Sequence, residues 1–225
     1  MPLLAFDTSG RDAVVGLILD DGQTVTREVP REAGRHARML IPTAAALVEE
    51  AGLATTDLTG LAVNLGPGSF TGLRVGVAAV QTLAWACDIP CIGVPLFDLL
   101  AAGSDPARDR LLVANAEREQ CFVATVAAGA TTPGEFTIED DEAVVARAAA
   151  GCQVVAPAPP RLGLADEHLI ELQRPAIEVL MTLASERLAA GQAVPPPQLL
   201  PIYGRRSAAE ELRDAGRRPK YEQQQ

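Results

Sequence analysis

Two short stretches of this chain carry residue types that bind phosphate or other anions. They are Asp7-Thr8-Ser9-Gly10 and Gly66-Pro67-Gly68-Ser69. The second separates an apolar run, residues 61–65, from a predicted helix over 71–86 that Ser69 or Thr71 can cap. A glycine turn before a capped helix presents backbone N–H groups at the positive helix end, which is an anion-binding geometry. A plain strand-to-helix connection also favours glycine, so both interpretations stay open.

Two better-known glycine motifs do not fit the second stretch. A P-loop requires a lysine followed by serine or threonine after its last glycine, whereas Gly72 is followed by Leu73 and Arg74. A nucleophile elbow requires glycine two residues before and after the serine, whereas Ser69 is flanked by Pro67 and Thr71 at those positions. The sequence therefore contains neither motif here.

The predicted helix over 71–86 is apolar on almost every side, which is typical of a helix covered on all sides. One face carries Leu73, Val77, Val80 and Ala84, and the opposite side carries Val75, Ala78, Ala79, Thr82 and Trp85. Gly72 and Gly76, four residues apart, would let another backbone approach closely. The pattern predicts either an internal helix of a layered α/β domain or a surface for a partner chain.

The elements before this helix are predicted to be three strands, over 3–6, 14–19 and 24–29, and a helix over 37–51. The helix has an apolar face that includes Leu40, Ala44 and Leu47. His36 precedes it. The chain contains only two histidines and neither has a second histidine four residues away, so we predict a helix-end histidine and no metal site.

The second half of the chain is predicted to repeat the opening hairpin. After a strand at 91–94 and a helix at 95–102, a polar break precedes two strands at 111–114 and 120–126. Later elements are predicted at 135–139 (strand), 140–150 (helix), 153–156 (strand) and 175–190 (helix). We expect an N-terminal subdomain over 1–97, a similar C-terminal subdomain over 98–203, and a disordered tail over 204–225.

Composition limits the classes of function. The chain has 225 residues, 48% of them apolar, and a formal net charge of −10, so the protein alone should repel nucleic acid. No apolar window is long enough to cross a membrane and no basic segment opens the chain, so neither a membrane span nor a signal peptide is expected. No serine–histidine–aspartate order, paired CxxC or HExxH motif indicates a catalytic site.

One motif closely resembles a known family signature. Leu65-Gly-Pro-Gly-Ser-Phe-Thr-Gly-Leu-Arg-Val-Gly76 is similar to the signature of the bacterial TsaB (YeaZ) family. Supporting stretches are Leu4-Ala-Phe-Asp-Thr-Ser9, Gly34–Pro42 and Ile89–Val94, with Pro201-Ile-Tyr203 as a weaker late match. The resemblance is dense from residue 1 to about 97 and thin beyond it. Ala37 departs from the family pattern, which usually has serine there.

The resemblance implies an α/β fold of the actin/hexokinase-like (ASKHA, ribonuclease H-like) type with two similar subdomains. In active members of that superfamily the first turn cradles phosphates and its aspartate helps position a metal. The implied nucleotide or phosphate site comprises Asp7, Thr8, Ser9, Gly66, Gly68 and Ser69. An Asx-type turn is the alternative role for Asp7. Asn115 stands where the family tends to have aspartate, which argues against self-contained ATP hydrolysis because asparagine supplies no negative charge.

The resemblance further implies an accessory subunit, silent in catalysis, that supports formation of N6-threonylcarbamoyladenosine at position 37 of tRNA in the cytoplasm. Its implied partners are a TsaD-like transferase and a TsaE-like small ATPase, with tRNA reached only through the complex and a homodimer as an option for the free chain. No tightly bound cofactor is implied, and ATP or ADP at a complex interface stays open. The expected interface comprises His36, Leu40, Ala44, Leu47, Gly72, Val75, Gly76 and Ala79. Alternatives are an active small-molecule kinase or ATPase and, with no residues to support it, a glycoprotease.

Overall fold

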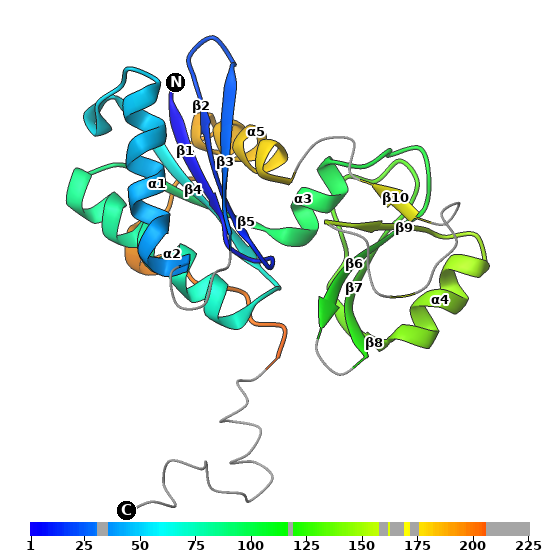
Figure 1. The fold of residues 1–225 in the computed structure, drawn as a ribbon. Helices are drawn as coiled ribbons and strands as arrows, with labels where there is room; N and C mark the ends of the chain where they lie inside the picture. Colours follow the sequence, from blue (N-terminus) through cyan, green and yellow to red (C-terminus); the bar gives the residue numbers. More distant parts are fainter. Residues whose placement is uncertain (31–35, 117–118, 158–161, 163–168, 172–175, 206–225) are drawn as a thin grey trace, which may run out of the picture.

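The first sheet of the protein has five strands in the order β3-β2-β1-β4-β5. The computed structural model describes residues 1–30, 36–116, 119–157, 162, 169–171 and 176–205. β1 pairs antiparallel with β2 and parallel with β4, and the outer pairs continue these directions (Figure 1). The strands are β1 (Leu3–Asp7), β2 (Ala13–Ile18), β3 (Thr24–Val29), β4 (Gly60–Gly66) and β5 (Cys91–Pro95).

The second sheet repeats this arrangement with the order β8-β7-β6-β9-β10. Its central strand β6 pairs antiparallel with β7 on one side and parallel with β9 on the other, as β1 does in the first sheet. The strands are β6 (Arg110–Ala116), β7 (Gln120–Val126), β8 (Thr137–Asp140), β9 (Gln153–Ala156) and β10 (Leu169–Glu171). The expected α/β fold with an internal duplication is therefore confirmed, whereas the sequence analysis missed β10.

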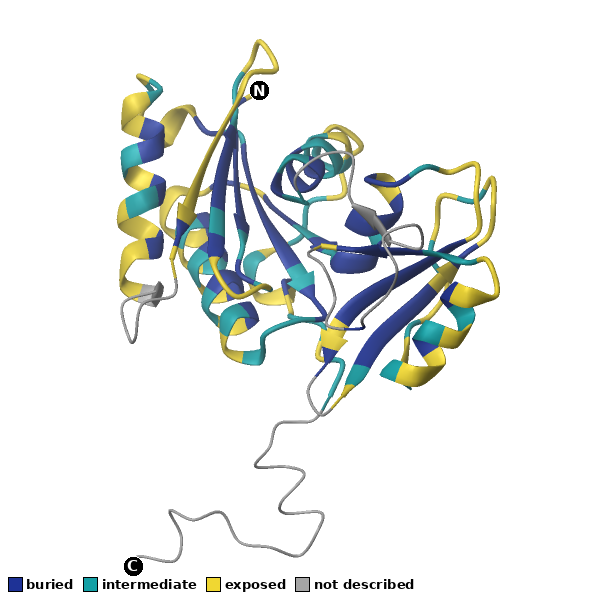
Figure 2. Ribbon diagram, turned by 45° about the vertical axis from the view of Figure 1, so that its right-hand side comes forward, coloured by how far each residue is buried: buried dark blue, intermediate teal, exposed yellow. Residues whose placement is uncertain are grey.

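The helices and sheets form alternating layers (Figures 1 and 2). One apolar cluster packs α1 and α2 on the outer face of the first sheet, and a second places α3 and α5 between the two sheets. A third packs α4 on the outer face of the second sheet. The helices are α1 (His36–Glu50), α2 (Phe70–Cys87), α3 (Leu96–Ala102), α4 (Asp141–Ala149) and α5 (Ala176–Ala189), with short 3-10 turns at Thr55–Asp57 (η1) and Pro196–Gln198 (η3).

The strand β1 shows why the sequence produces these layers. Leu3 and Ala5 belong to the central cluster, whereas Leu4 and Phe6 belong to the cluster under α1 and α2. Successive side chains of a strand point to opposite faces, so an uninterrupted apolar run supplies both cores at once. Such a strand is stable only when both of its faces are covered. In this fold α1 and α2 cover one face, and α3 and α5 cover the other.

The chain returns to the first sheet at its C-terminal end. α5 contacts β1, β2, β4 and β5, and the residues after it run along α2. The expected C-terminal subdomain over 98–203 is therefore corrected, because residues 176–203 pack on the N-terminal lobe. The N-terminal lobe thus consists of the first sheet with its helices, and the C-terminal lobe consists of the second sheet with α4. Residues 206–225 of the expected tail lie outside the described residues.

An ion pair between β3 and α1 should make a small, pH-dependent contribution to stability. The Arg27 guanidinium donates two hydrogen bonds of 2.9 and 2.8 Å to the Glu50 carboxylate, which lowers the pKa of Glu50 below its ordinary value. A lowered folded-state pKa stabilises the protein above the unfolded pKa, and this contribution is lost as the pH falls through the folded value. Both side chains are exposed, so the effect is screened by salt.

Urea denaturation at different pH values tests this pair. We expect the wild-type midpoint to exceed that of Arg27→Gln near neutral pH and the two midpoints to converge in acid. Arg108→Gln, at another exposed arginine, is the matched control. A gap between wild type and Arg27→Gln that stays constant into acid would contradict the assignment.

Candidate functional site

A cleft with a volume of about 680 Å³ separates the two lobes. Its walls come from the β1–β2 turn, the loop after β4, the end of β6 and the start of α5. It brings together Asp7, Ser9, Gly68 and Ser69 from the N-terminal lobe with Asn115 from the C-terminal lobe. The first four were predicted from the sequence as phosphate-binding residues. The other two predicted residues, Thr8 and Gly66, are buried beside the cleft and do not line it.

Hydrogen bonds within the protein engage both oxygens of Asp7. Oδ1 accepts from the Ser9 backbone N–H at 3.0 Å and from Ser9 Oγ at 2.7 Å. Oδ2 accepts from Asn64 Nδ2 at 3.2 Å, and the same amide nitrogen lies 3.0 Å from Ser9 Oγ. Asp7 thus closes an Asx-type turn at the end of β1, which was the alternative role considered from the sequence.

Asn64 is a site residue that the sequence analysis missed. It is fully buried in β4, and its Oδ1 accepts the Gly66 backbone N–H at 2.9 Å while its Nδ2 reaches the Asp7 turn. Asn64 therefore fixes the end of β4 to the end of β1. An asparagine inside the otherwise apolar run 61–65 was the available signal, because a buried amide needs partners.

Replacing Asn64 should destabilise the protein. Asn64→Ala leaves the Gly66 N–H and the Asp7 carboxylate without this partner, and we expect the free energy of unfolding to fall by about 2 kcal/mol. Urea denaturation measures the change. Asn115→Ala, at an exposed position of the same cleft, should stay within about 0.5 kcal/mol of wild type. A loss of no more than about 0.5 kcal/mol for Asn64→Ala as well would show that the Asn64 network contributes little stability.

The glycine loop before α2 packs on the β1 turn. The Ser69 N–H donates to the Ser9 carbonyl at 2.8 Å, and Ser69 Oγ accepts from the Gly72 N–H at 3.3 Å as the cap of α2. A Cβ on Gly68 would lie 2.6 Å from the Ser9 carbonyl oxygen. The predicted cap is confirmed for Ser69. The Ser69 and Gly72 N–H groups, which an anion would need, are hydrogen-bonded within the chain.

The described lining of the cleft has a net negative charge. Its described lining contains the carboxylates of Asp7, Asp12 and Glu28 and one cation, Arg11. Phosphate groups require cations or free N–H donors, and a net negative lining opposes them. Among the described residues no group of three or more histidine, cysteine or acidic side chains could hold a metal ion.

The structure corrects several residues expected at a partner interface. Leu40, Ala44 and Leu47 are buried in the core between α1 and the first sheet. Gly72 and Gly76 face inward, because a Cβ on either would meet Thr8 at 2.0 to 2.2 Å. These five residues therefore do not form an exposed surface. The side chain of His36 lies outside the described residues.

The exposed face of α2 is a different set of residues. Val75 and Ala79 are half-buried and pack against the core under α2. Before the exposed helix end at Ala86 and Cys87, the exposed positions of α2 follow one another at intervals of three or four residues, which places them on one side of the helix. They are Thr71, Arg74, Ala78, Thr82 and Trp85, and the Trp85 side chain is 81% exposed. We call this set the α2 stripe.

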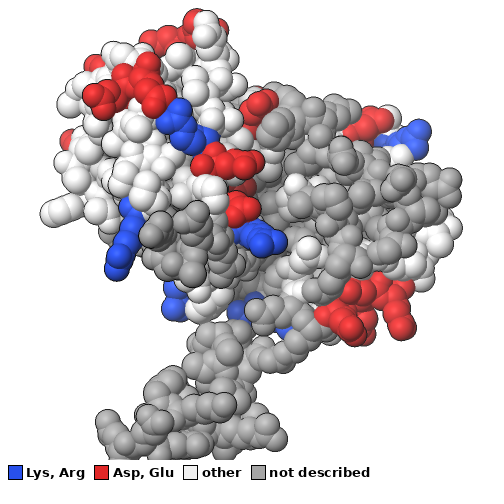
Figure 3. Space-filling model, in the orientation of Figure 1, with Lys and Arg blue, Asp and Glu red and all other residues white. Residues whose placement is uncertain are grey.

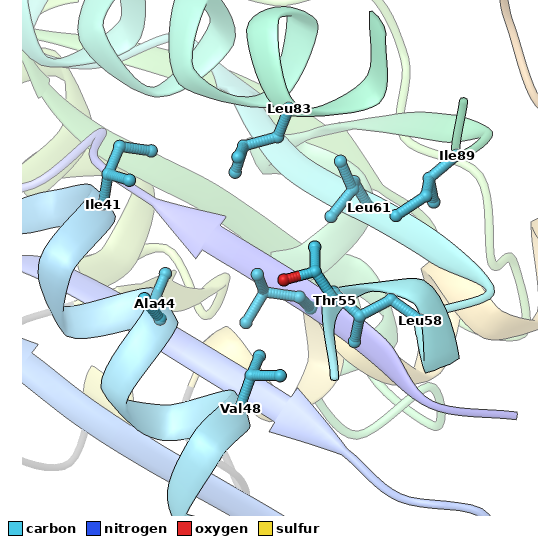
Figure 4. A pocket seen from close by; sticks show the side chains of 10 residues that line it. Ile41, Ala44, Val48, Thr55, Leu58, Leu61, Leu83 and Ile89 are labelled. Atoms are coloured by element: carbon cyan, nitrogen blue, oxygen red, sulfur yellow. The ribbon is translucent and has the colours of Figure 1, made fainter. Parts of the chain in front are cut away.

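An apolar pocket of about 50 Å³ lies between α1 and α2 (Figure 4). Ile41 and Ala44 enter it from α1, Leu83 from α2, and Leu58 and Ile89 from the adjoining segments. Ile41 is 39% exposed and Met39, on the same helix, is 48% exposed. The pocket extends the apolar surface beside the α2 stripe.

The C-terminal segment 194–203 runs along α2 in the opposite direction. The Val194 N–H donates to the Cys91 carbonyl at 3.0 Å, and Gln81 Nε2 donates to the carbonyls of Pro196 and Leu199, both at 2.9 Å. At its end, Arg74 Nε lies 2.9 Å from the Tyr203 hydroxyl. The late family match Pro201–Tyr203 is therefore part of the support of α2.

Charged side chains are unevenly distributed on the face shown in Figure 3. Acidic side chains gather on both lobes, whereas the visible basic side chains are scattered. This distribution agrees with the net charge of −10, and the described residues form no large basic patch on this face. By length and composition α2 would suffice to cross a membrane, a test that core helices of soluble proteins also pass.

The duplicated sheets, the interlobe cleft and the turn at Asp7 define a two-lobed protein of the actin/hexokinase-like class. Comparison with known proteins narrows this class. The family model for tRNA N6-adenosine threonylcarbamoyltransferase (TsaD) matches residues 24–194. An uncharacterized protein of Mycobacterium tuberculosis is 32% identical over 213 residues, covering 93% of this chain and 94% of that protein.

Two further relatives carry informative names. The tRNA threonylcarbamoyladenosine biosynthesis protein TsaB of Bacillus subtilis is 34% identical over 102 residues, which is 45% of this chain and 44% of that protein. The structure of YeaZ from Pseudomonas aeruginosa aligns with a TM-score of 0.69 at 28% identity, covering 90% of this chain and 99% of that one. The chain belongs to the TsaB (YeaZ) family within the group that the TsaD model describes, as its central motif predicted.

Proposed function

We propose that this protein is a non-catalytic scaffold subunit in the formation of N6-threonylcarbamoyladenosine at position 37 of tRNA, and that it binds the TsaD-like transferase. The α2 stripe is the observation that carries this proposal. Trp85 on this helix face is 81% exposed, and tryptophan is enriched where proteins bind one another. The names of the TsaB relatives supply the pathway.

The α2 stripe has the geometry of a helix-packing surface. Its residues recur every three or four positions, and Ala78 at its centre lets a partner helix approach closely. Thr82 directs its hydroxyl back to the Ala78 carbonyl at 2.7 Å, so this polar group is already satisfied when the face is covered. We infer that the corresponding helices of the transferase pack against α1 and α2 as a four-helix bundle.

The remaining roles follow from the charges and the cleft. A net charge of −10 argues that the protein reaches tRNA only through the complex. In this proposal the complex is located in the cytoplasm, and a TsaE-like ATPase joins it. The acidic cleft supports the proposal that this subunit binds no cofactor tightly. In an alternative form of the proposal, ATP or ADP binds at an interface between subunits. A homodimer through the α2 stripe would cover the same surface in the free protein.

The second candidate function is that of an actin-like small-molecule kinase or ATPase. The interlobe cleft, with Asp7 and the glycine loop on its wall, is the observation that favours it. The engaged Asp7 carboxylate and the asparagine at position 115 argue against it. ATP turnover by the isolated protein that is lost in Asp7→Asn would support the kinase and contradict the scaffold.

Size-exclusion chromatography with light scattering tests the scaffold. The protein is run alone and then mixed with the TsaD-like subunit of the same organism, with and without ATP. We expect a one-to-one complex without added nucleotide, and the run of the protein alone shows whether a homodimer must dissociate first. Unchanged elution of both proteins in every mixture would overturn the proposal.

A further inference from the structure

We propose that a second pocket, at the junction of the lobes, binds a small oxyanion such as a carboxylate or a phosphate group through Arg110. The pocket has a volume of about 500 Å³ and shares no lining residue with the interlobe cleft. Its walls come from α3 and α5 and from two segments of the C-terminal lobe, residues 104–110 and 131–133. This inference is independent of the proposed function.

Arg110 is a buried cation without a negative partner. It opens β6, is 1% exposed and lines the pocket. Its Nη1 donates to the Ala101 carbonyl at 3.0 Å and to Ser104 Oγ at 3.2 Å, and its Nη2 donates to the Ala130 carbonyl at 2.5 Å. All three acceptors are neutral, and within the described part of the chain no carboxylate pairs with this guanidinium.

The unsatisfied part of this guanidinium is its Nε. This atom is buried and has no hydrogen-bond partner among the described residues. Burying a charge costs several kcal/mol unless a counter-charge and a full set of hydrogen bonds offset it. Three carbonyl or hydroxyl acceptors provide part of that set and no counter-charge. An anion in the adjoining pocket, which Arg110 lines, would supply the missing counter-charge.

The rest of the pocket fits a small anion. Arg187 contributes a second guanidinium, which is already paired with Asp98 at 2.5 Å and with the Gly93 carbonyl at 3.2 Å. The pair cancels in charge, so the described lining keeps the single positive charge of Arg110. Thr131 and Thr132 also line the pocket, and hydroxyl and guanidinium donors together recognise carboxylate and phosphate oxygens.

The position of the pocket has a structural consequence. α3 and α5 belong to the layer that packs on the first sheet, whereas Arg110 and residues 131–133 belong to the C-terminal lobe. A bound anion would therefore touch both lobes and restrain their relative movement. Ligands that bind only the folded protein stabilise it by mass action, so the binding can be measured as a thermal shift.

Inorganic phosphate and succinate serve as probes, each compared with sodium chloride at matched ionic strength. We expect saturable binding of at least one probe by isothermal titration calorimetry, with a rise in melting temperature that chloride does not reproduce. Phosphate binding alone would identify a phosphate site, and succinate binding alone a carboxylate site. Absence of saturable binding by either probe would overturn the proposal and leave Arg110 as a clamp between α3 and the loop at Ala130.

Two variants separate a binding role for the pocket from a structural one. Ala102→Phe fills the pocket from an exposed position on α3 without altering Arg110, and should abolish probe binding in a folded protein. Ala146→Phe, on the exposed side of α4, is the matched control and should bind like wild type. Arg110→Lys, if folded, should bind at least about tenfold more weakly because lysine lacks the planar donor fork. Unchanged binding by Ala102→Phe would place the anion elsewhere.

Discussion

Gly72→Ala should lower the free energy of unfolding by about 3 kcal/mol, the upper part of the range for overpacked sites. In this α-helix a Cβ at position 72 would lie 2.0 Å from the Thr8 carbonyl oxygen, which is backbone and cannot rotate away. At an exposed helix position the same change would stabilise by up to about 1 kcal/mol, because alanine is the better helix former. A loss of stability would therefore indicate that α2 closely approaches the end of β1, whereas a gain would indicate an exposed helix position. Urea denaturation monitored by circular dichroism measures it.

Gly76→Ala distinguishes a side-chain clash from a backbone clash. Its Cβ would lie 2.2 Å from Thr8 Oγ1, so the double variant Gly76→Ala/Thr8→Ala should recover most of the lost stability. Thr8→Ala should not rescue Gly72→Ala, since the carbonyl stays in place. Gly134→Ala is the control, because its nearest neighbour would lie at an ordinary 3.7 Å. Similar small effects for all three glycines would contradict the packing of α2 described above.

These two glycines also show where sequence reasoning fails. A helix that is apolar all round carries no periodic signal for which side faces the sheet, so Gly72 and Gly76 were placed on the outer side. The structure turns them inward because Thr8, from the end of β1, occupies the space that their missing side chains leave. A different error placed Leu40, Ala44 and Leu47 at the partner interface: helical spacing correctly identified them as one apolar face, but that face packs on the first sheet.

Local patterns determined most of the secondary structure. The strands at 24–29, 120–126 and 153–156 have the bounds expected from alternation and turn residues, and the helices differ by one residue or so at each end. β10 was missed because its three residues are a strand only through parallel pairing with β9. The return of α5 to the first sheet was missed for the same reason, since nothing in its own sequence names the sheet on which it packs.

The sequence predicted several residues that line the candidate site, but it did not predict which of their polar atoms are already hydrogen-bonded within the protein. The resemblance to actin-like proteins placed Asp7 and Asn115 near one cleft, and both line it. Which atoms already have partners depends on distant residues such as Asn64, and the polar residue in that apolar run indicates a buried partner without identifying Asp7 as that partner. The hydrogen bonds to Asp7 show that it anchors a turn, whereas its role in positioning a metal stays a prediction.

Trp85→Ala should weaken the complex with the transferase about 30-fold, an effect of about 2 kcal/mol that is typical of a tryptophan hot spot. Trp85 is the single tryptophan of the chain and is 81% exposed in the free protein. Transfer of its indole ring into an interface would shift its fluorescence to shorter wavelength on mixing, after the partner's own emission is subtracted. An unshifted spectrum in a complex that still forms would place the interface away from the α2 stripe.

Ala78→Glu should have the larger effect, weakening the same complex about 100-fold, because a carboxylate would be buried in a helix–helix contact without a counter-charge. Ala78 is the better position for this test than Val75 or Ala79, whose half-buried side chains pack on the core and whose replacement would destabilise the subunit itself. Ala146→Glu on the exposed side of α4 is the matched control and should bind like wild type. Equal dissociation constants for Ala78→Glu, Ala146→Glu and wild type, with all three folded, would show that the α2 stripe does not bind the transferase.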